Sequence, residues 1–457
     1  MNAEYEILRR RHQAEAMALV PEHLARITWS RERLQAHREQ SLRTLVEVAQ
    51  RQSRWHRGRL GHLNPRCLRE EDLSDLPVMT KQDLMTNFDS ILTDPRLKLD
   101  ALESHLAGLT TDAYFLDRYH VVSSSGSSGR RGVFVYDWDA WTLCYLSLRR
   151  YGFLKIAQAE RTHANPIVMA KIGAARALHI SSAIAQTFSN PLLTIHSFPM
   201  TSAMERIVEG LNSLQPEFLE GYSSALFQLA KEALAGNLRI APRWVSSISE
   251  PLLPEIRKAA EEAWKVPVLN VWGTSEAGAC GASCGLGSGM HLTDDLLLIE
   301  PVDDKGRHVR PGVRSAKVYV TNLYNLTLPL IRYELTDEVT LVDGPCPCGS
   351  HHQRIEDVLG RLDDTFSYAG GPSVHPHLFR SALAGERNIV EYKVTQTARG
   401  ATIAVVCNSE IDEGQLRARI VTSLTDLGLR GPEVGIVRVD RLERLGSGKL
   451  KRFVPLT

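Results

Sequence analysis

The 457-residue chain lacks the features that would point to a membrane, a secreted scaffold or a nucleic acid. No apolar run approaches the roughly 18 residues needed to span a bilayer, and the first residues contain no apolar core of a signal peptide. Lys plus Arg (54) nearly balance Asp plus Glu (53), which argues against nucleic-acid binding and a polybasic membrane face. The seven cysteines do not form the pattern of a disulfide framework. We therefore expect a cytoplasmic protein that binds neither nucleic acid nor membrane.

Length and composition describe an ordinary globular chain. Hydrophobic residues make up 43% of it and charged residues 23%. A chain of this length can bury a large core and should divide into two or more domains. The sequence shows no internal repeat and no long low-complexity tract.

Apolar spacing predicts helices at the start of the chain, followed by alternating strands and helices. Residues 1 to about 55 carry apolar residues at helical spacing, and Thr80 with Asp83 forms the pattern of a helix-capping box. Ser202 and Glu205 form the same pattern. Between residues 243 and 273, two short strands flank a helix over 254–264, and this alternation predicts a layered α/β sheet.

The pattern changes toward the C-terminus. Strands are predicted between residues 296 and 343, and a compact unit follows residues 360–364. This unit has a helix near 375–385, a hairpin across Arg399 and Gly400, a helix over 412–427 and a strand over 433–443. We therefore place a domain boundary at Gly360–Asp364.

A loop rich in serine and glycine lies between two valine-rich segments, with the sequence VVSSSGSSGRRGVFVYD over residues 121–137. One interpretation is a flexible surface loop, since small polar residues are common there. The other is a phosphate cradle, in which backbone N–H groups and hydroxyls close around an anion. The segment is not a Walker loop, because neither GSSGRR nor the later GSGK (446–449) fits that pattern.

Three other segments carry polar residues that suit phosphate chemistry. Thr274, Ser275 and Glu276 follow a predicted strand, and a hydroxyl beside a carboxylate suits Mg²⁺ bound to phosphates, although a capped turn into a helix explains them too. Asp337 could bind ribose hydroxyls or simply form a turn. Lys449 lies on a glycine-flanked segment, where an exposed solubilising lysine is the alternative.

The order of these segments resembles that of the adenylate-forming (acyl-CoA synthetase-like) superfamily. A Ser/Gly loop, a hydroxyl–glutamate pair, R-Y-x-x-[TS]-D, G-R-x-D-D and G-x-G-K-x-x-R follow one another along the chain. The chain is most similar to the phenylacetate–CoA ligase branch, through EEDLSDLPVMTKQDL (70–84) and the segment over 196–230. The resemblance covers nearly the whole chain.

The resemblance implies an α/β fold with a large N-terminal domain of layered sheets and helices and a small, mobile α+β C-terminal domain. The N-terminal adenylation domain would span residues 1–360, with a helical start over 1–110. The C-terminal lid would span residues 361–457, with a hinge near Asp363. ATP and substrate would bind at the junction of the two domains.

The resemblance also implies roles for individual residues. It assigns ATP binding to Ser124, Ser125, Gly126, Ser127, Ser128, Gly129, Arg130, Ser249, Glu250, Pro251, Trp272, Ser275 and Asp337. It assigns catalysis to Lys449, Glu276 and Arg361, with Glu276 also binding Mg²⁺. Arg130 departs from the family pattern, which usually has lysine, but its planar guanidinium can still bind phosphate.

These roles agree with the chemistry of adenylation. Attack of a carboxylate on the α-phosphate builds negative charge on oxygens while pyrophosphate leaves, so the site needs fixed donors, a cation and Mg²⁺. A lysine carried by a lid supplies that cation on closure and then withdraws, so that a second nucleophile reaches the acyl-adenylate. Coenzyme A is the acceptor that the resemblance implies, although the C-terminal unit is short for the family.

Four residues form a candidate metal site. Cys284, His291, Cys346 and Cys348 supply three thiolates and one imidazole, a closed tetrahedral set that suits a structural zinc. Members of the phenylacetate-ligase branch have a similar pattern. Cys280, His351 and His352 are rival ligands, and the alternative is a group of reduced cysteines without metal.

The substrate is predicted only by class. Phe198, Met200 and Tyr222 are candidate pocket residues or plain core, and an apolar pocket with an aromatic wall fits an aryl or arylalkyl carboxylate. The leading hypothesis is an ATP-dependent carboxylate–CoA ligase. A relative that transfers to an amine or a carrier thiol, or activates nitrite for diazotisation of an aryl amine, is the second. A non-catalytic nucleotide-binding scaffold is the third. The expected partners are the carboxylate and ATP, and a homodimer is compatible with the sequence.

Overall fold

The computed structural model describes the chain except for residues 1–2, 125–131, 160–165, 175, 191–192, 201, 359–363, 375, 385, 387, 408, 445–449 and 457. The predicted mixed α/β class is confirmed. Among the described helices, none combines the length and the apolar character needed to cross a membrane.

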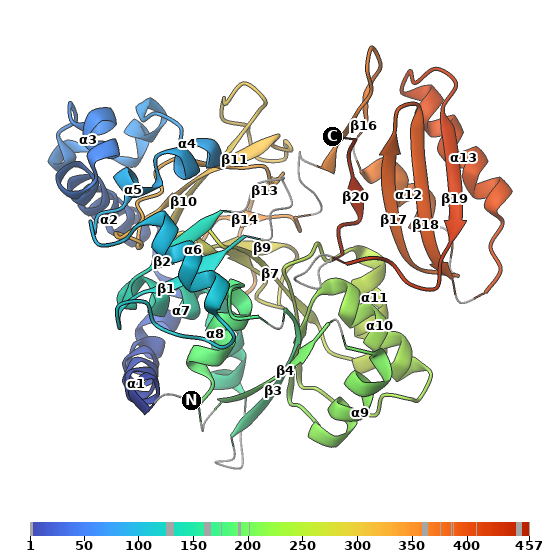
Figure 1. The fold of residues 1–457 in the computed structure, drawn as a ribbon, viewed down its shortest axis with the longest axis horizontal. Helices are drawn as coiled ribbons and strands as arrows, with labels where there is room; N and C mark the ends of the chain where they lie inside the picture. The colour runs from blue at the N-terminus through green and yellow to red at the C-terminus, as the bar shows by residue number, and fades with distance from the viewer. Residues whose placement is uncertain are drawn as a thin grey trace.

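Helices form the first part of the chain and pack beside the strands (Figure 1). They are α1 (Ala3–Ala25), α2 (Arg31–Gln52), α3 (Arg54–Leu60), α4 (Lys81–Thr86), α5 (Phe88–Ile91) and α6 (Leu99–Gly108). The capping box predicted at Thr80 and Asp83 is confirmed at the start of α4. Leu42, Leu45 and Val46 of α2 are fully buried in a core that also includes Ile331.

A nine-stranded sheet is the centre of the molecule, with the strand order β13-β14-β9-β8-β7-β6-β5-β3-β4. The strands β4, β3, β5, β6 and β7 are parallel neighbours, and β8, β9, β14 and β13 continue the sheet in antiparallel fashion. The bounds are β3 (Ile167–Gly173), β4 (Leu193–Pro199), β5 (Phe218–Gly221), β6 (Trp244–Ile248), β7 (Val268–Thr274), β8 (Gly278–Ala282), β9 (Met290–Leu292), β13 (Leu341–Val342) and β14 (Arg354–Ile355).

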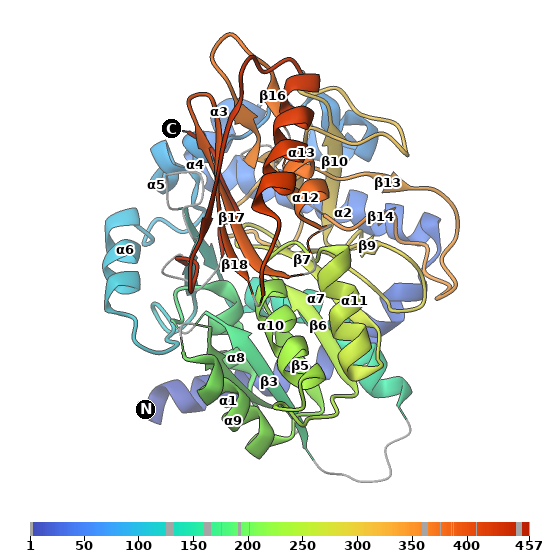
Figure 2. The ribbon, with the colours of Figure 1, turned by 90° about the vertical axis from the view of Figure 1, so that its right-hand side faces the viewer.

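Helices cover both faces of this sheet, as alternate side chains of its strands require. On one face, Met169 and Phe218 pack in a core with α7 (Trp138–Gln158) and α8 (Ile180–Phe188). On the other face, Ile172 and Leu219 pack with α9 (Met204–Leu214), α10 (Ser223–Leu234) and α11 (Pro254–Trp264). Figure 2 shows α9, α10 and α11 in front of these strands.

Two smaller sheets complete the large body. The hairpin of β1 (His120–Ser123) and β2 (Val133–Tyr136) is antiparallel and fully buried. A second sheet has the order β10-β11-β12, with β10 (Leu297–Val302), β11 (Lys317–Asn322) and β12 (Tyr333–Leu335). The predicted strands of these regions are confirmed.

The last part of the chain has a hydrophobic core of its own. Its buried members all lie between Phe366 and Phe453, and Figure 1 shows this C-terminal unit beside the large body. Its four-stranded sheet has the order β19-β18-β17-β20 and packs against two helices. The elements are β15 (Phe366–Ser367), β16 (Ser373–Val374), α12 (His377–Ala384), β17 (Ile389–Thr397), β18 (Gly400–Cys407), α13 (Glu413–Asp426), β19 (Glu433–Arg438) and β20 (Phe453–Val454). The proposed boundary at Gly360–Asp364 stays a prediction, because residues 359–363 lie outside the described residues.

Two local predictions need correction. The capping box at Ser202 and Glu205 is wrong: α9 begins at Met204, Ala203 holds the N-cap position, and no side chain caps the helix. The reason is a turn just before it, in which the Ser202 N–H donates to the Pro199 carbonyl. The predicted strand over 433–443 is shorter and ends at Arg438.

Candidate active site and metal centre

The carboxyl ends of five parallel strands meet at one edge of the large sheet, which we call the carboxyl edge. Ligands of open α/β sheets bind outside such an edge. The strands end at Pro199 (β4), Gly173 (β3), Gly221 (β5), Ile248 (β6) and Thr274 (β7). Most of the described candidate residues lie at or just beyond these ends, namely Phe198, Met200, Tyr222, Ser249, Glu250, Pro251, Trp272, Ser275 and Glu276.

Glu250, just beyond β6, connects the large body to the C-terminal unit. Its carboxylate accepts hydrogen bonds from the backbone N–H groups of Ser224 and Leu450, both at 2.9 Å. Ser224 lies in the first turn of α10, where the helix dipole favours a negative charge. The preceding Ser249 has a φ of 72°, a left-handed conformation that is costly for a residue with a side chain. The turn is therefore held in a strained shape, and its acid binds the segment that follows Lys449.

Arg444 makes a second contact between the two parts. Its guanidinium donates to the Ser224 hydroxyl at 3.1 Å and to the Glu391 carboxylate at 2.6 Å. Sequence reasoning missed this contact and that of Leu450, since Arg444 and Ser224 are 220 residues apart.

The turn after β7 carries the predicted hydroxyl–carboxylate pair. The Thr274 hydroxyl accepts a hydrogen bond from the Ala277 N–H at 3.1 Å. Tyr136 donates to the Ser275 carbonyl at 2.7 Å, and Asn322 donates to the Glu276 carbonyl at 3.2 Å. The chain then turns back as β8, so the alternative of a turn leading into a helix is wrong. Partners from β2 and β11 thus fix the backbone that presents the half-buried Glu276.

The charges of Glu276 and Asp337 both affect the buried Cys280 thiol. Burial is the largest cause that raises the pKa of the Cys280 thiol, and the charges of Asp337 and Glu276 raise it further. Burial also raises the pKa of Tyr333, with Glu276 as the next cause. Two carboxylates that the sequence separates by 61 positions (337 − 276) therefore act on one buried thiol.

The apolar candidates are buried near the carboxyl edge. Tyr222 is 1% exposed and Met200 6% exposed in the core with α9 to α11, and Phe198 packs against that core. The ring of Tyr222 lies close to Gly173, where an added Cβ would come within 3.2 Å of it. Trp272 is buried in the core on the other face of the sheet. The substrate and adenine roles of these residues stay predictions.

Only the base of the Ser/Gly loop lies within the described residues. The Ser124 hydroxyl accepts hydrogen bonds from the Gly132 N–H at 2.8 Å and from the Lys81 ammonium at 3.3 Å. The sequence analysis did not predict that Lys81 lies at this loop, although Lys81 directly follows the capping Thr80 within the segment over 70–84. The remaining catalytic, loop and hinge candidates, Ser125, Gly126, Ser127, Ser128, Gly129, Arg130, Arg361, Asp363 and Lys449, lie outside the described residues.

The structure brings the four predicted metal ligands together. One ligand atom from each of Cys284, His291, Cys346 and Cys348 lies within 4.8 Å of all the others. The Sγ atoms of Cys284 and Cys346 are 3.7 Å apart, and Cys348 Sγ is 3.3 Å from His291 Nε2. A tetrahedral zinc with Zn–S bonds of about 2.3 Å holds sulfur atoms about 3.8 Å apart. The spacing and the donor set therefore fit zinc.

The lowered pKa of Cys284 and the surroundings of the rival residues agree with these four ligands. Burial raises the pKa of Cys284, but hydrogen bonds from His291 and the N–H groups of Leu286 and Gly287 outweigh it and lower the pKa to about 6. Among the rivals, the two ring nitrogens of His352 lie 3.0 and 3.1 Å from the carbonyl oxygens of Leu292 and Arg26. Cys280 lies beside Thr274, and His351 is exposed.

The sequence is similar to those of known proteins. No family model matches the chain. The chain is similar to a phenylacetate-coenzyme A ligase of Thermus thermophilus, with 26% identity over 230 residues, 49% of this chain and 49% of the ligase. It is also similar to Protein CapK of Staphylococcus aureus, with 22% identity over 343 residues, 71% of this chain and 67% of CapK. The match to the first relative thus spans about half of that protein's length.

Solved structures share the fold. A 2-hydroxyisobutyryl-CoA ligase in complex with 2-HIB-AMP superposes with a TM-score of 0.72 at 19% identity, over 94% of this chain and 91% of that one. The amide bond synthetase McbA from Marinactinospora thermotolerans gives a TM-score of 0.51 at 17% identity, over 73% and 67%. The chain therefore shares its α/β fold with adenylate-forming, acyl-CoA synthetase-like proteins.

Proposed function

We propose that this protein is an ATP-dependent ligase of the phenylacetate–CoA ligase branch. It activates a carboxylate as an acyl-adenylate with release of pyrophosphate and then transfers the acyl group to coenzyme A. The observation that carries the proposal is the contact of Glu250 with Leu450, which brings the segment after Lys449 to the carboxyl edge. The similarity to a phenylacetate-coenzyme A ligase supports the same activity.

In the first step, a carboxylate oxygen of the substrate attacks the α-phosphorus of ATP, and the bond from that phosphorus to pyrophosphate breaks. Lys81 and Ser124 lie at the base of the Ser/Gly loop, where an ammonium and a hydroxyl suit the phosphate chain. Glu276 and Ser275 provide a carboxylate and a hydroxyl that would hold Mg²⁺, whose charge would offset that of the phosphates. Lys449 would neutralise the charge that develops at the α-phosphate.

For the second step, the C-terminal unit would turn about Asp363 and withdraw Lys449. The contacts of Arg444 and Leu450 with Ser224 and Glu250 of the large body are hydrogen bonds. Such contacts break at little cost compared with a buried apolar interface. The thiol of coenzyme A would then attack the acyl carbon, and AMP would leave.

The acyl pocket follows from the three apolar candidates. Phe198 lies near the end of β4, Met200 follows β4 and Tyr222 follows β5. The strand between them, β3, ends at Gly173, which the Tyr222 ring approaches closely. An aromatic and thioether wall favours an aryl or arylalkyl acid over a short polar one.

A structural zinc at Cys284, His291, Cys346 and Cys348 belongs to the same proposal. Cys284 lies just beyond β8, His291 lies in β9, and Cys346 and Cys348 lie in the connection between β13 and β14. A bound ion would therefore tie this connection to β9 and to the end of β8 in the antiparallel part of the sheet. A closed set of four protein ligands leaves no open position for chemistry.

A second candidate is transfer of the activated acyl group to an amine, which the likeness of fold to an amide bond synthetase favours. The test is release of pyrophosphate with a panel of aryl acids, with and without coenzyme A, amines or nitrite. We expect release that requires the acid, and an acyl product that requires coenzyme A. A product that forms only with an amine or nitrite would support the alternative acceptors. Lack of ATP turnover with every acid, amine and nitrite would refute the adenylating function and favour a scaffold.

A further inference from the structure

Four buried polar residues lie together between α7 and the strands β3 and β5. Tyr145 and Arg149 are one helical turn apart on α7, and Lys171 of β3 is the register partner of Glu220 in β5. All four residues are at most 5% exposed. Arg149 donates a hydrogen bond to the Glu220 carboxylate in a buried ion pair. We call these four residues the Lys171 cluster.

The Lys171 cluster contains more donors than the protein itself satisfies. Lys171 Nζ, Arg149 Nε and the Tyr145 hydroxyl have no hydrogen-bond partner among the residues that the structure describes, and neither does Glu220 Oε1. Buried polar groups of folded proteins are nearly always hydrogen-bonded to protein, to water or to a ligand. Three groups that can donate stand against one carboxylate oxygen that accepts, so the cluster suits a group rich in acceptors.

The Lys171 cluster also carries more positive than negative charge. Burial lowers the pKa of Lys171 to about 8, although the charge of Glu220 raises it, so the amine is mostly protonated at pH 7. Glu220 forms its ion pair with Arg149, and Lys171 forms none within the described part of the chain. A neutral amine would leave its N–H groups unpaired as well, so the need for an acceptor does not depend on the protonation of Lys171.

Lys171 lies beside the candidate acyl pocket. Gly173 ends β3 two residues after Lys171, so the two positions face the same side of the sheet. A Cβ added at Gly173 would come within 3.6 Å of Lys171 Nζ and within 3.2 Å of the Tyr222 ring. The amine and the Tyr222 ring therefore converge at the carboxyl edge, at a position that has no side chain of its own.

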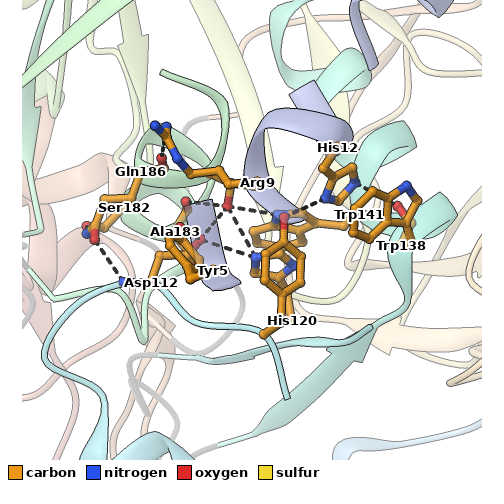
Figure 3. A network of polar contacts seen from close by, with 12 residues as sticks. Tyr5, Arg9, His12, Asp112, His120, Trp138, Trp141, Ser182, Ala183 and Gln186 are labelled. Atoms are coloured by element: carbon orange, nitrogen blue, oxygen red, sulfur yellow. Dashed lines mark hydrogen bonds and ion pairs between the residues drawn. The ribbon is translucent and has the colours of Figure 1, made fainter. Parts of the chain in front are cut away.

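A buried polar network beside α1 shows the difference (Figure 3). In that network, Asp112 accepts hydrogen bonds from Tyr5 at 2.6 Å and from Thr187 at 2.7 Å, and His120 Nε2 lies 3.2 Å from the same carboxylate. The buried acid thus has partners within the protein. Lys171 Nζ has no hydrogen-bond partner in the part of the chain that the structure describes.

We propose that the Lys171 cluster binds a second carboxylate of the substrate and thereby selects a dicarboxylic aryl or arylalkyl acid. The inference rests on the proposed function, which places the reacting carboxylate at the carboxyl edge. The second carboxylate accepts a hydrogen bond from Lys171 Nζ, and Arg149 Nε and the Tyr145 hydroxyl are the further donors. Its negative charge balances that of the Lys171 amine. Lys171 is therefore a specificity-determining residue.

The test is isothermal titration calorimetry of the full chain at pH 7. The ligands are phenylacetate, 3- and 4-carboxyphenylacetate, and the 3- and 4-nitro compounds, because a nitro group has the shape of a carboxylate without its charge. We expect one of the two diacids to bind about tenfold or more tightly than its nitro counterpart. Lys171→Met removes the amine from a side chain of similar length. It should abolish this preference and leave the affinity for phenylacetate within about twofold of wild type.

Lys155→Met is the matched control, because Lys155 is a half-buried lysine of α7 outside the Lys171 cluster, and the variant should keep the preference for the diacid. A second variant keeps the test decisive if Lys171→Met fails to fold. Tyr145→Phe removes a hydroxyl that makes no hydrogen bond within the described chain, and it should weaken binding of the preferred diacid about threefold or more. If Lys171→Met does not fold, a Tyr145→Phe variant that binds the diacid like wild type overturns the inference.

Two further results would overturn the inference. Neither diacid may bind more tightly than its nitro counterpart, which is the result expected if buried water serves the cluster. Alternatively, Lys171→Met weakens phenylacetate as much as the diacid, which would assign the amine to the reacting carboxylate.

Pyrophosphate release with the same acids separates this inference from the proposed function. Release with phenylacetate, without any preference for a diacid in binding, would overturn the inference and leave the proposed function standing. A diacid preference in binding that Lys171→Met abolishes, without pyrophosphate release from any acid, would support the second carboxylate site and contradict the proposed function.

Discussion

The Cys/His cluster and the carboxyl edge differ in how they are built. In the cluster, ligand atoms from four residues meet within 4.8 Å, and three of the four residues are buried. At the carboxyl edge, the candidates lie along the ends of five strands, and a separate unit of the chain contacts them through Glu250 and Ser224. A closed set can stabilise a fold, whereas an open edge beside a second unit can take up substrates and release products. Variants of the two regions should therefore change different properties.

The largest effect is expected from Lys449→Ala. Loss of the cation that meets the developing charge should lower acid-dependent pyrophosphate release by about a hundredfold or more, while ATP binding stays nearly unchanged. Stopped assays of pyrophosphate and titration with ATP measure the two quantities. Lys258→Ala, at an exposed position of α11, is the control. Unchanged pyrophosphate release in Lys449→Ala would refute the assignment.

Removal of zinc should act on stability rather than on chemistry. Elemental analysis should find about one zinc per chain. A chelator, or Cys346→Ser, should lower Tm by several degrees, whereas Cys67→Ser, at an exposed cysteine outside the cluster, should leave it unchanged. Less than half an equivalent of zinc in the purified protein would contradict this part of the account.

A smaller effect on the reaction is expected from Glu250→Gln. The N–H groups of Ser224 and Leu450 donate to different oxygens of the Glu250 carboxylate, so the amide of glutamine keeps an acceptor for only one of them and lacks the charge that strengthens both bonds. Adenylation should slow about tenfold, through weaker docking of the C-terminal unit. Glu255→Gln, in the first turn of the neighbouring α11, is the matched control. Equal rates in the two variants would show that the contact has no part in the reaction.

The smallest effect is expected from Asp294→Asn, and it concerns the pH dependence of stability. Asp294 lies just beyond β9, the strand that carries His291. Burial raises the pKa of Asp294 to about 7, so the folded state favours the protonated acid. This stabilisation is present below the ordinary pKa of an aspartate and is lost as pH rises through 7. Urea unfolding at pH 5 and pH 8 should show that the substitution removes part of the loss of stability at the higher pH. An unchanged pH dependence would contradict the raised pKa.

The sequence predicted those features that depend on local pattern. The order of motifs indicated the superfamily, apolar periodicity predicted β6, β7 and α11 closely, and cysteine spacing selected the four clustered residues from seven candidates. Contacts between distant residues were missed, because no local pattern encodes the approach of Arg444 to Ser224 or of Lys81 to Ser124. The turn after β7 was left open between a helix and other structures, because a capped turn has the same residues whether a helix or a strand follows it.

A buried hydrogen-bond network beside α1 also escaped sequence reasoning, for a related reason. Asp112, His120 and Thr187 are ordinary residues in their own segments, and only the fold brings them into contact.

The central claim is that the carboxyl edge forms an acyl-adenylate. The most direct test is exchange of labelled pyrophosphate into ATP, with Mg²⁺ and an aryl acid but without coenzyme A. The account predicts exchange that requires the acid and is lost in Glu276→Gln. Exchange that proceeds without any acid, or that is unaffected by Glu276→Gln, would contradict it.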